Sequence, residues 1–317
     1  MEKFLELEEI TLLPAKKNVG MTDMNFFDGE MFPIFTAPSP EICGEYSAEE
    51  WMKNRIQSII SRDEPIEYRL KMCPWMFAAF TPVEIDAEFL RKDRRGQGTC
   101  LKIYIDTLNG LDASLLQLAF NLKNAYQDRM LLMSGPCANP EAYLSYSQAG
   151  IQYMVAGPGI GKKYGFDYPL AQLLIDIERF KGTGAIGFKP IKVVADGDFT
   201  NPIDIMKAIA IGADAVMVRK GFVRVVEAEG TIYAKTTTPD GKVSMDEVTD
   251  QDALSRISRE DLKKASLARL YEGKWNPVNI KIEDWVKKFK EVAAYAFMMT
   301  GTKTWAEFKK EVKYGRI

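Results

Sequence analysis

Histidine is absent from this sequence of 317 residues. Its absence excludes the Ser-His-Asp and Cys-His arrangements that activate a nucleophile, and it also excludes histidine-ligated zinc or iron. Any proton transfer must therefore use Asp, Glu, Lys, Tyr, Cys, Thr or Arg.

Cysteine is scarce, and its four positions are scattered with no CxxC or other metal-binding spacing: Cys43, Cys73, Cys100 and Cys137. We therefore expect reduced thiols in a cytoplasmic protein and no metal site. No run of about 18 apolar residues is long enough for a transmembrane helix. The acidic start MEKFLELEEITLLP also lacks the apolar run of a signal peptide. The net charge of −2 favours neither nucleic acid nor a membrane as a partner.

Apolar runs that are typical of buried strands recur along the chain. We expect strands at Phe32–Ala37, Ile56–Ser61, Trp75–Phe80, Lys102–Asp106, Met130–Ser134, Tyr153–Ala156, Ile191–Ala195 and Ala215–Val218. Helical stretches separate them, at Ser47–Asn54, Ser114–Tyr126, Pro140–Gln148, Leu170–Phe180 and Pro202–Ile211. Near-continuous apolar strands that alternate with helices predict a parallel sheet. Eight such units predict one domain over residues 1–317, a (β/α)8 TIM barrel.

Two of the helices have clear start signals. Asn139-Pro140 and Asn201-Pro202 each place Asn at the N-cap and Pro at the first helical position.

Polar or glycine-rich turns follow the later strands, where a barrel of this type carries its active site. They begin at Asp106, Gly135, Gly157, Asp196 and Arg219. The turns after strands seven and eight commonly hold a phosphate. We therefore expect an anion-binding site at this end of the barrel.

Residues 222–256 depart from the regular alternation and read as a polar, hairpin-like excursion with turns at Glu229-Gly230 and Pro239-Asp240-Gly241. This length is too great for a simple connection, so we expect a mobile flap over the site. Helices are expected over 258–312, at Ser258–Leu270, Ile282–Met299 and Trp305–Val312.

These turns, taken in order, resemble the IMP dehydrogenase/GMP reductase family along nearly the whole chain. IYIDTLNG is similar to the family's DTAHG or DVANG turn, and AGPGIG is similar to GIGPGS. VVADGDFTNPIDIMKAIAIGADAVMV resembles IADGG…GDIAKALAAGADAVML, and the tail YEGKWNPV resembles EGKTVEVP. The chain has no regulatory insertion between its early strands. In this respect it resembles the GMP reductases more than the IMP dehydrogenases. Motifs in the family's order are a stronger signal than one glycine motif.

The resemblance implies a purine nucleotide oxidoreductase that uses NADP(H) or NAD(H) and assembles as a homotetramer. It implies that Asp196 holds the ribose hydroxyls, since a carboxylate accepts two charge-assisted hydrogen bonds. It places the 5′-phosphate by Gly197 and the glycines Gly157, Gly159 and Gly221. It puts the cofactor beside Asp106, Asn109 and Gly110, and it gives Glu260 a role in proton transfer. Glu260 also fits a capping box or a solvated helix face.

The sequence departs from the family at its catalytic loop, which in the family reads GPGSICTTR. Ile160 stands at the phosphate-binding serine and Lys162 at the nucleophilic cysteine. Lys162 would be a nucleophile only with a depressed pKa. We also predict that Lys162 or Lys163 replaces the monovalent cation that the family's loop carbonyls bind. Cys137 is either a relocated thiol or a buried structural one.

The phosphate turns differ as well. Asp198 stands where the family has a second glycine, and Arg219 and Lys220 replace small residues. These two cations favour an anion that is bound differently from the family's phosphate, or they lie in a solvated turn.

Three functions remain open from the sequence. The first is a purine nucleotide oxidoreductase whose mechanism does not use the family's cysteine. The second is a catalytically lapsed paralogue that binds a nucleotide as a sensor or partner subunit. The third is an FMN-binding barrel oxidoreductase, because flavin barrels use the same phosphate turns.

Overall fold

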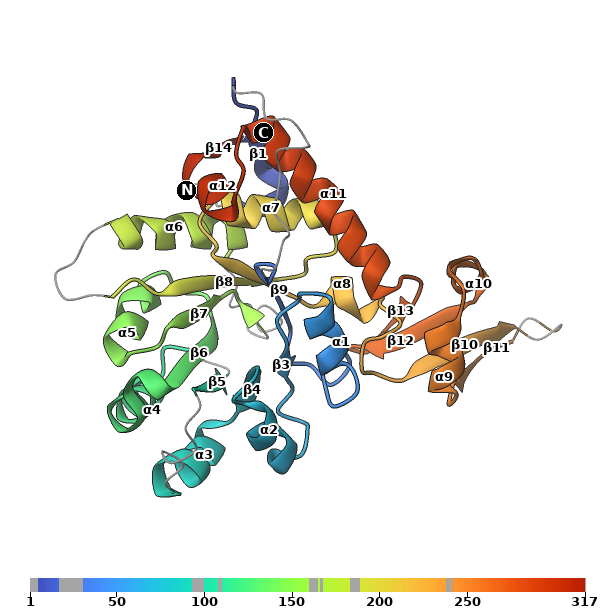
Figure 1. The fold of residues 1–317 in the computed structure, drawn as a ribbon, viewed down its shortest axis with the longest axis horizontal. Coiled ribbons are helices and arrows are strands. Elements are labelled where there is room, and N and C mark those ends of the chain that lie inside the picture. Colours follow the sequence, from blue (N-terminus) through green and yellow to red (C-terminus); the bar gives the residue numbers. More distant parts are fainter. Residues whose placement is uncertain are drawn as a thin grey trace.

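The computed structural model describes residues 5–16, 31–92, 100–107, 110–159, 165, 168–182, 189–237, 240 and 242–316. Its main body is a parallel sheet curled into a barrel and ringed by helices, with a smaller sheet to one side (Figure 1). Both chain ends lie at the same edge of the molecule, beside the long helix α11 (Figure 1).

The barrel has eight strands, and each overlaps one of the eight predicted apolar runs. They are β2 (Ile34–Thr36), β3 (Ile59–Ile60), β4 (Phe77–Phe80), β5 (Leu101–Asp106), β6 (Met130–Cys137), β7 (Tyr153–Ala156), β8 (Lys192–Gly197) and β9 (Ala215–Val218). Neighbours pair in the order β2-β9-β8-β7-β6-β5-β4-β3. Phe35 also bridges Gln57 in parallel, just before β3, which closes the sheet. The predicted (β/α)8 TIM barrel is confirmed.

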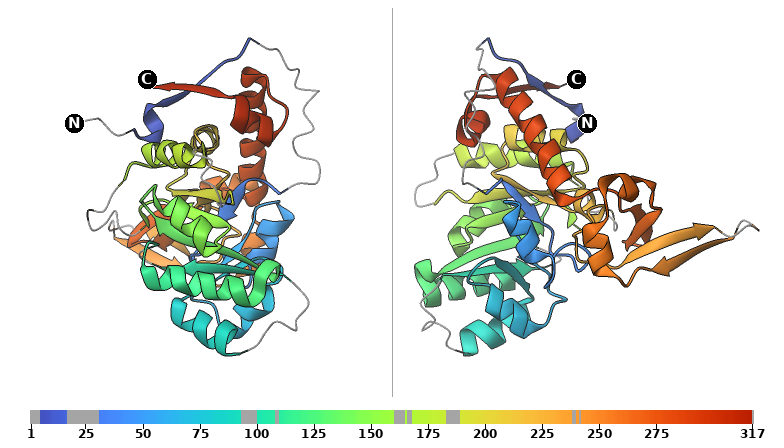
Figure 2. Two further views of the ribbon diagram at one scale, coloured as in Figure 1. Left: turned by 90° about the vertical axis from the view of Figure 1, so that its left-hand side faces the viewer. Right: turned by 45° about the vertical axis from the view of Figure 1, so that its right-hand side comes forward.

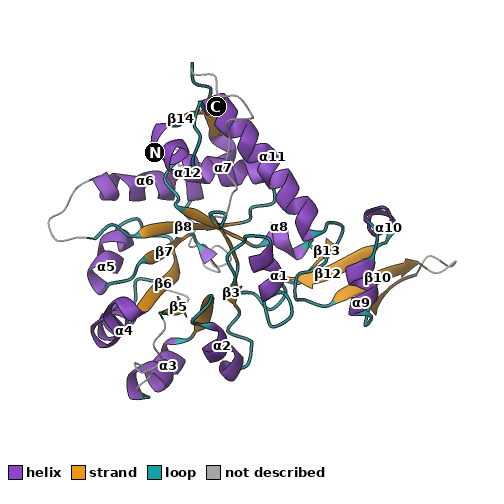
Figure 3. Cartoon of the chain, viewed as in Figure 1, coloured by secondary structure: helices purple, strands orange, loops and turns teal. Residues whose placement is uncertain are grey.

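Helices alternate with the strands and form the outer layer (Figure 3). They are α1 (Ala48–Lys53), α2 (Ile66–Met72), α3 (Pro82–Ile85), α4 (Ala113–Tyr126), α5 (Ala142–Ala149), α6 (Leu170–Gly182), α7 (Pro202–Ala210) and α8 (Lys220–Val223). Asn201 caps α7, since its side-chain oxygen accepts the Ile203 N–H at 3.1 Å. The predicted start at Asn139-Pro140 is wrong by two residues, because the N-cap of α5 is Glu141; Asn139 instead accepts the Glu141 N–H at 2.9 Å in the turn before the helix.

Aromatic side chains fill the inside of the barrel. Phe35 of β2, Phe77 of β4 and Tyr153 of β7 pack edge to face, with ring centroids 5.4 to 6.3 Å apart. Such contacts across the sheet require all three rings to point inward. The barrel is therefore a packed core, and ligands are restricted to the loops at its ends.

The excursion after β9 is a second, four-stranded antiparallel sheet. Its strands, in the order β11-β10-β12-β13, are β10 (Ile232–Thr237), β11 (Val243–Glu247), β12 (Leu267–Tyr271) and β13 (Lys274–Pro277). The helices α9 (Gln251–Arg256) and α10 (Arg259–Lys264) connect β11 to β12. This sheet projects from the side of the barrel (Figure 2). A small core holds it together, made of Val226, Ile232, Leu254, Leu262, Leu267 and Val278.

The predicted hairpin is present as β10 and β11, but the helix predicted over Ser258–Leu270 is wrong in its second half. It ends at Lys264, and β12 follows. Buried and less buried residues alternate from Leu267 to Tyr271, which is the period of a strand and not of a helix. The sheet therefore extends the excursion to Pro277, beyond the residue 256 expected from the sequence.

The two ends of the chain pair with each other. β1 (Ile10–Leu13) runs antiparallel to β14 (Lys313–Arg316), beside α11 (Ile282–Thr300) and α12 (Trp305–Glu311). Gly301 ends α11 in the left-handed conformation, with φ of 69°. Among the described residues, no helix combines the length and the apolar character needed to cross a membrane.

Candidate functional site

Charged side chains of both signs gather at the carboxyl ends of the barrel strands. The carboxylates are Asp106, Asp196 and Asp198, and the cations are Arg62, Arg219 and Lys220. They form three ion pairs, which differ strongly in exposure. We call this end of the barrel its mouth.

The most buried pair joins Arg219 to Asp196. Arg219 Nε donates to Asp196 Oδ1 and Arg219 Nη2 donates to Asp196 Oδ2, each at 2.8 Å. The Asp196 side chain is 2% exposed and that of Arg219 is 24% exposed. Burial opposes the charge of Arg219, but Asp196 outweighs it, so the pKa of Arg219 lies well above its usual value. Both carboxylate oxygens are thus held by one fixed cation.

Strand pairing explains why these two residues meet. Asp196 of β8 pairs with Met217 of β9 and Gly197 pairs with Val218, so Arg219 follows β9 only two residues beyond the partner of Asp196. Gly157 stabilises the position of Asp196 from the other side. A Cβ atom on Gly157 would lie 2.4 Å from the Asp196 carbonyl oxygen, so only glycine allows this approach.

The second pair, Lys220 with Asp198, lies in solvent. Its two side chains are 40% and 58% exposed. Exposed ion pairs contribute little to stability and are screened by salt, so little free energy is needed to separate Lys220 from Asp198. Of the two cations after β9, Lys220 is therefore the one that is free to turn toward a ligand.

Tyr271 brings the excursion sheet into the mouth. It ends β12 at a tight hairpin, where Glu272 and Gly273 have positive φ of 49° and 73°. The Tyr271 side chain is buried, and its hydroxyl lies beside the Arg219 guanidinium. Burial raises the pKa of Tyr271 despite the opposing effect of Arg219, so the phenol stays protonated. The sequence analysis did not single out Tyr271, because only the fold brings β12 to the barrel.

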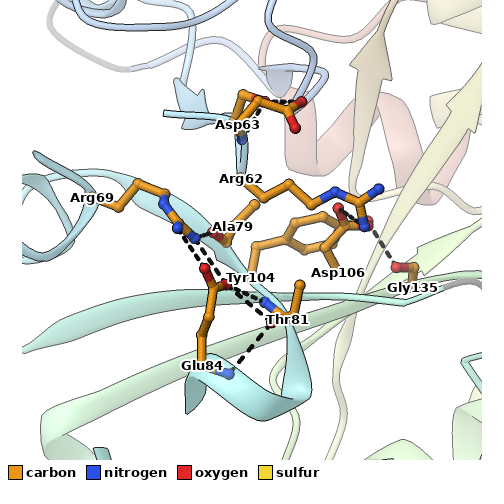
Figure 4. A network of polar contacts seen from close by, with 10 residues as sticks. Arg62, Asp63, Arg69, Ala79, Thr81, Glu84, Tyr104, Asp106 and Gly135 are labelled. Atoms are coloured by element: carbon orange, nitrogen blue, oxygen red, sulfur yellow. Dashed lines mark hydrogen bonds and ion pairs between the residues drawn. The ribbon is translucent and has the colours of Figure 1, made fainter. Parts of the chain in front are cut away.

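The third pair joins Arg62, which follows β3, to Asp106, at the end of β5. Their closest atoms, Arg62 Nη1 and Asp106 Oδ2, are 3.3 Å apart (Figure 4). Burial raises the pKa of Asp106, against the lowering by Arg62 and Arg219. Because Asp196 and Arg219 both influence Asp106, the two pairs belong to one site. Arg62 is a second residue that the sequence analysis missed.

A neighbouring network is structural. Arg69 donates to both oxygens of Glu84, at 3.0 and 2.6 Å, and to the Ala79 carbonyl of β4 (Figure 4). Burial raises the pKa of Glu84, but hydrogen bonds from Arg69 and Thr81 lower it further, so the net shift is downward. This network fixes the end of β4 beneath Arg62.

Three buried hydroxyls, those of Tyr104, Ser134 and Tyr146, lie near the carboxyl ends of β5 and β6. Tyr104 donates to the Gly135 carbonyl at 2.8 Å (Figure 4). Among the described residues, the hydroxyls of Ser134 and Tyr146 have no hydrogen-bond partner of normal geometry. The Tyr146 hydroxyl lies against Gly110, where an added Cβ would come within 2.1 Å of it. Packing therefore requires glycine at position 110.

Cys137 is not an activated thiol. It is buried at the end of β6, and burial raises the pKa of its thiol. A raised pKa keeps the sulfur protonated and weakly nucleophilic. The structure thus favours the buried structural thiol over the relocated nucleophile.

The other predicted residues take different places. Gly159 has φ of 51° and lies against Pro136, and Gly221 lies against the Phe199 carbonyl oxygen. Glu260 is exposed in the first turn of α10, on the excursion sheet, and no hydrogen bond or ion pair between described residues joins it to the mouth. Asn109, Lys162 and Lys163 lie outside the described residues.

The arrangement suits an anion better than a sugar. A vicinal diol needs carboxylate oxygens that it can reach, whereas both oxygens of Asp196 are held by Arg219 and the Asp196 side chain is only 2% exposed. The guanidinium has five N–H groups, so some remain for a ligand anion or for the Tyr271 hydroxyl. The mouth therefore offers cationic donors at Arg219, Lys220 and Arg62.

Comparisons with known proteins agree with this fold. A family model described as the IMP dehydrogenase / GMP reductase domain matches residues 97–317. A GMP reductase of Clostridium acetobutylicum is 24% identical over 302 residues, which cover 89% of each chain. A GMP reductase of Bacillus licheniformis is 27% identical over 262 residues, or 77% of each chain. The crystal structure of inosine 5′-monophosphate dehydrogenase from Legionella pneumophila superposes with a TM-score of 0.71 at 16% identity, covering 99% and 98% of the two chains.

Proposed function

Because the chain belongs to the IMP dehydrogenase/GMP reductase family of purine nucleotide oxidoreductases, we propose that it binds a purine nucleoside 5′-monophosphate at the mouth. We further propose that it catalyses an oxidoreduction there with a nicotinamide cofactor, without the family's cysteine. The observation that carries the proposal is the meeting of two ion pairs, Asp196–Arg219 and Asp106–Arg62, at one barrel end.

The phosphate is proposed to lie over the turns after β8 and β9. Arg219 supplies N–H groups that Asp196 does not use, and Lys220 supplies an ammonium once its exposed pair with Asp198 opens. The turn at Gly197 is closely packed, because an added Cβ there would lie 2.9 Å from the Leu170 side chain, and glycine lets the backbone pass. Gly157, Gly159 and Gly221 act by shaping these turns.

The cofactor is proposed to lie on the side of β5, along Asp106, Asn109 and Gly110. A bound NADP(H) or NAD(H) would supply or accept a hydride. Arg62, whose side chain is 45% exposed, is placed to contact the cofactor's phosphates. By analogy with the family, we propose a cytoplasmic homotetramer with no nucleic acid or membrane partner.

Proton transfer is proposed to use groups of this chain other than a thiol. The candidates are Glu260, the buried phenol of Tyr271, and Lys162 of the loop after β7. Lys162 or Lys163 remains our proposed replacement for the family's monovalent cation. Tyr271 has the advantage of position, since it is buried beside Arg219 in the mouth.

A second function is favoured by one specific observation. Arg219 occupies both oxygens of Asp196, the residue that the resemblance assigns to the ribose. A chain that keeps a nucleotide site but has lost its nucleophile and its free ribose acceptor fits a catalytically lapsed sensor or partner subunit.

Cofactor turnover separates these candidates. The purified protein is mixed with GMP, IMP, XMP or AMP and with NADPH or NADH, or with the oxidised cofactors. Cofactor absorbance is followed through a single turnover at high enzyme concentration. A nucleotide-dependent change supports the oxidoreductase. Nucleotide binding without any change supports the lapsed paralogue. A yellow protein that releases FMN on denaturation would replace both with the flavin barrel.

A further inference from the structure

Arg219 holds both oxygens of Asp196, the residue to which the family resemblance assigns the ribose. The Asp196 side chain beneath Arg219 is only 2% exposed. The two hydrogen bonds between them, each 2.8 Å long, use one N–H on Nε and one on Nη2. A ribose diol could reach these oxygens only by displacing the guanidinium from a buried, bidentate contact.

The rest of the mouth keeps Arg219 where it is. Tyr271 lies beside the guanidinium from the excursion sheet, and Tyr104 and Asp106 lie near it from β5. The 24% of the Arg219 side chain that remains exposed leaves part of it accessible to a ligand. In this pair, Asp196 fixes the guanidinium in place, and Arg219 offers its remaining N–H groups to a ligand.

We propose that the Asp196–Arg219 pair is an anion receptor that recognises the phosphate of a nucleoside monophosphate and ignores its 2′- and 3′-hydroxyls. Arg219 contacts the ligand, and Asp196 is a positioning residue that acts through Arg219. The identification of the ligand as a nucleotide rests on the proposed function. The substrate class is then a purine 5′-monophosphate in which ribose, 2′-deoxyribose and 2′,3′-dideoxyribose bind alike.

Lys220 has a smaller share in this receptor. Its partner Asp198 is 58% exposed, so the Lys220 ammonium must be drawn from a solvated pair and gains little beyond screening. The two pairs differ in burial and in geometry, because Arg219 holds Asp196 through two hydrogen bonds whereas Lys220 makes one exposed contact with Asp198. Lys220→Gln is therefore expected to weaken nucleotide binding less than a substitution at Arg219 does.

The decisive comparison needs no variant. Binding of GMP, 2′-deoxy-GMP and 2′,3′-dideoxy-GMP to the wild-type chain is measured by titration calorimetry. The proposal predicts dissociation constants within about threefold of one another, because no hydroxyl contact is lost. If Asp196 instead accepts the diol, the loss of charge-assisted hydrogen bonds weakens the dideoxy nucleotide by about tenfold or more. That result would overturn the proposal and leave the proposed function intact.

Variants test the division of roles. Arg219→Lys keeps the positive charge but loses the bidentate geometry of the guanidinium. It is expected to weaken GMP binding by about tenfold or more. Asp196→Asn keeps the shape of the side chain but removes the charge that holds the Arg219 guanidinium. It is expected to weaken the binding of all three nucleotides by the same factor. Lys220→Gln is expected to weaken GMP binding by a smaller factor than Arg219→Lys does, because its charge is exposed and screened. Circular dichroism verifies that each variant is folded. GMP binding that survives Arg219→Lys unchanged would place the receptor elsewhere.

Inorganic phosphate separates the receptor from the nucleotide. If no nucleotide binds but phosphate raises the melting temperature of the wild type and not of Arg219→Lys, the receptor stands and the proposed function fails. If neither nucleotide nor phosphate raises the melting temperature of the wild type, both fail.

Discussion

Arg269 gives the sharpest test of how the excursion sheet is attached to the barrel. Its side chain is fully buried in β12, and its guanidinium donates to backbone carbonyls. The acceptors are Gly230 at 2.8 Å, Val223 at 2.5 Å, Val225 at 2.9 Å, Ala228 at 2.8 Å and Val226 at 3.5 Å. One side chain thus ties β12 to the segment that leaves the barrel after α8.

We predict that Arg269→Met destabilises the protein by about 3 kcal/mol. Four of the five hydrogen bonds are short, and each contributes about 1 kcal/mol net. Burial of the cation offsets part of this sum, since it lowers the pKa of Arg269 to about 10. Methionine matches the length of the side chain but leaves the carbonyls without donors, so the loss reflects hydrogen bonding more than packing.

The assay is guanidinium chloride unfolding combined with amide hydrogen exchange. Exchange is expected to accelerate in β12 and β13 while the barrel strands keep their protection, because the sheet is released locally. Arg269→Lys is the matched control, and it should recover only part of the loss because its ammonium has three donors. Since Tyr271 is two residues further on the same face of β12, ligand binding at Arg219 should weaken as well. A change below about 0.5 kcal/mol with unaltered exchange would refute this reasoning.

Three further predictions concern single contacts. Asp214→Asn should cost about 2 kcal/mol at neutral pH, because Asp214 bonds Lys181 and Lys309 in a largely buried cluster. Burial raises the pKa of Asp214 but the two lysines lower it further, below its usual 3.8. Its contribution is therefore present above that pH and lost as pH falls through the lowered pKa, so urea unfolding should show the variant and the wild type converging in acid. Asn201→Ala should cost about 1 kcal/mol through loss of the α7 cap, seen as a lower melting temperature, and an unchanged one would deny the cap any role. Cys137→Ser should leave nucleotide-induced thermal shifts and turnover unaltered, whereas loss of turnover with normal binding would make the thiol catalytic.

The barrel was predictable because its strands are buried on both faces and read as near-continuous apolar runs. The excursion was less so. β12 is short and follows the helix-forming stretch Arg259–Lys264, so the local pattern extended the predicted helix past Lys264. Only the pairing of β12 with β10 and β13 decides in favour of a strand.

The location of the charged side chains at the strand ends was predictable, but their pairings were not. Strand ends correctly placed Asp106, Asp196 and Arg219 at one face. That Arg219 binds Asp196 instead of facing outward depends on side-chain conformation and burial, which a motif does not record. Tyr271 and Arg62 were not singled out because the fold, and not the local sequence, brings β12 and the turn after β3 to the mouth.

The measurement that tests the central claim most directly is the thermal shift of the wild-type protein with GMP, alone and with NADPH, beside Arg219→Lys. A ligand that binds only the native state stabilises it by about 2.7 kcal/mol at 100 times its dissociation constant. We predict a higher melting temperature with GMP, a further rise with NADPH, and a strongly reduced response in the variant. An unchanged melting temperature with every purine monophosphate would contradict the account.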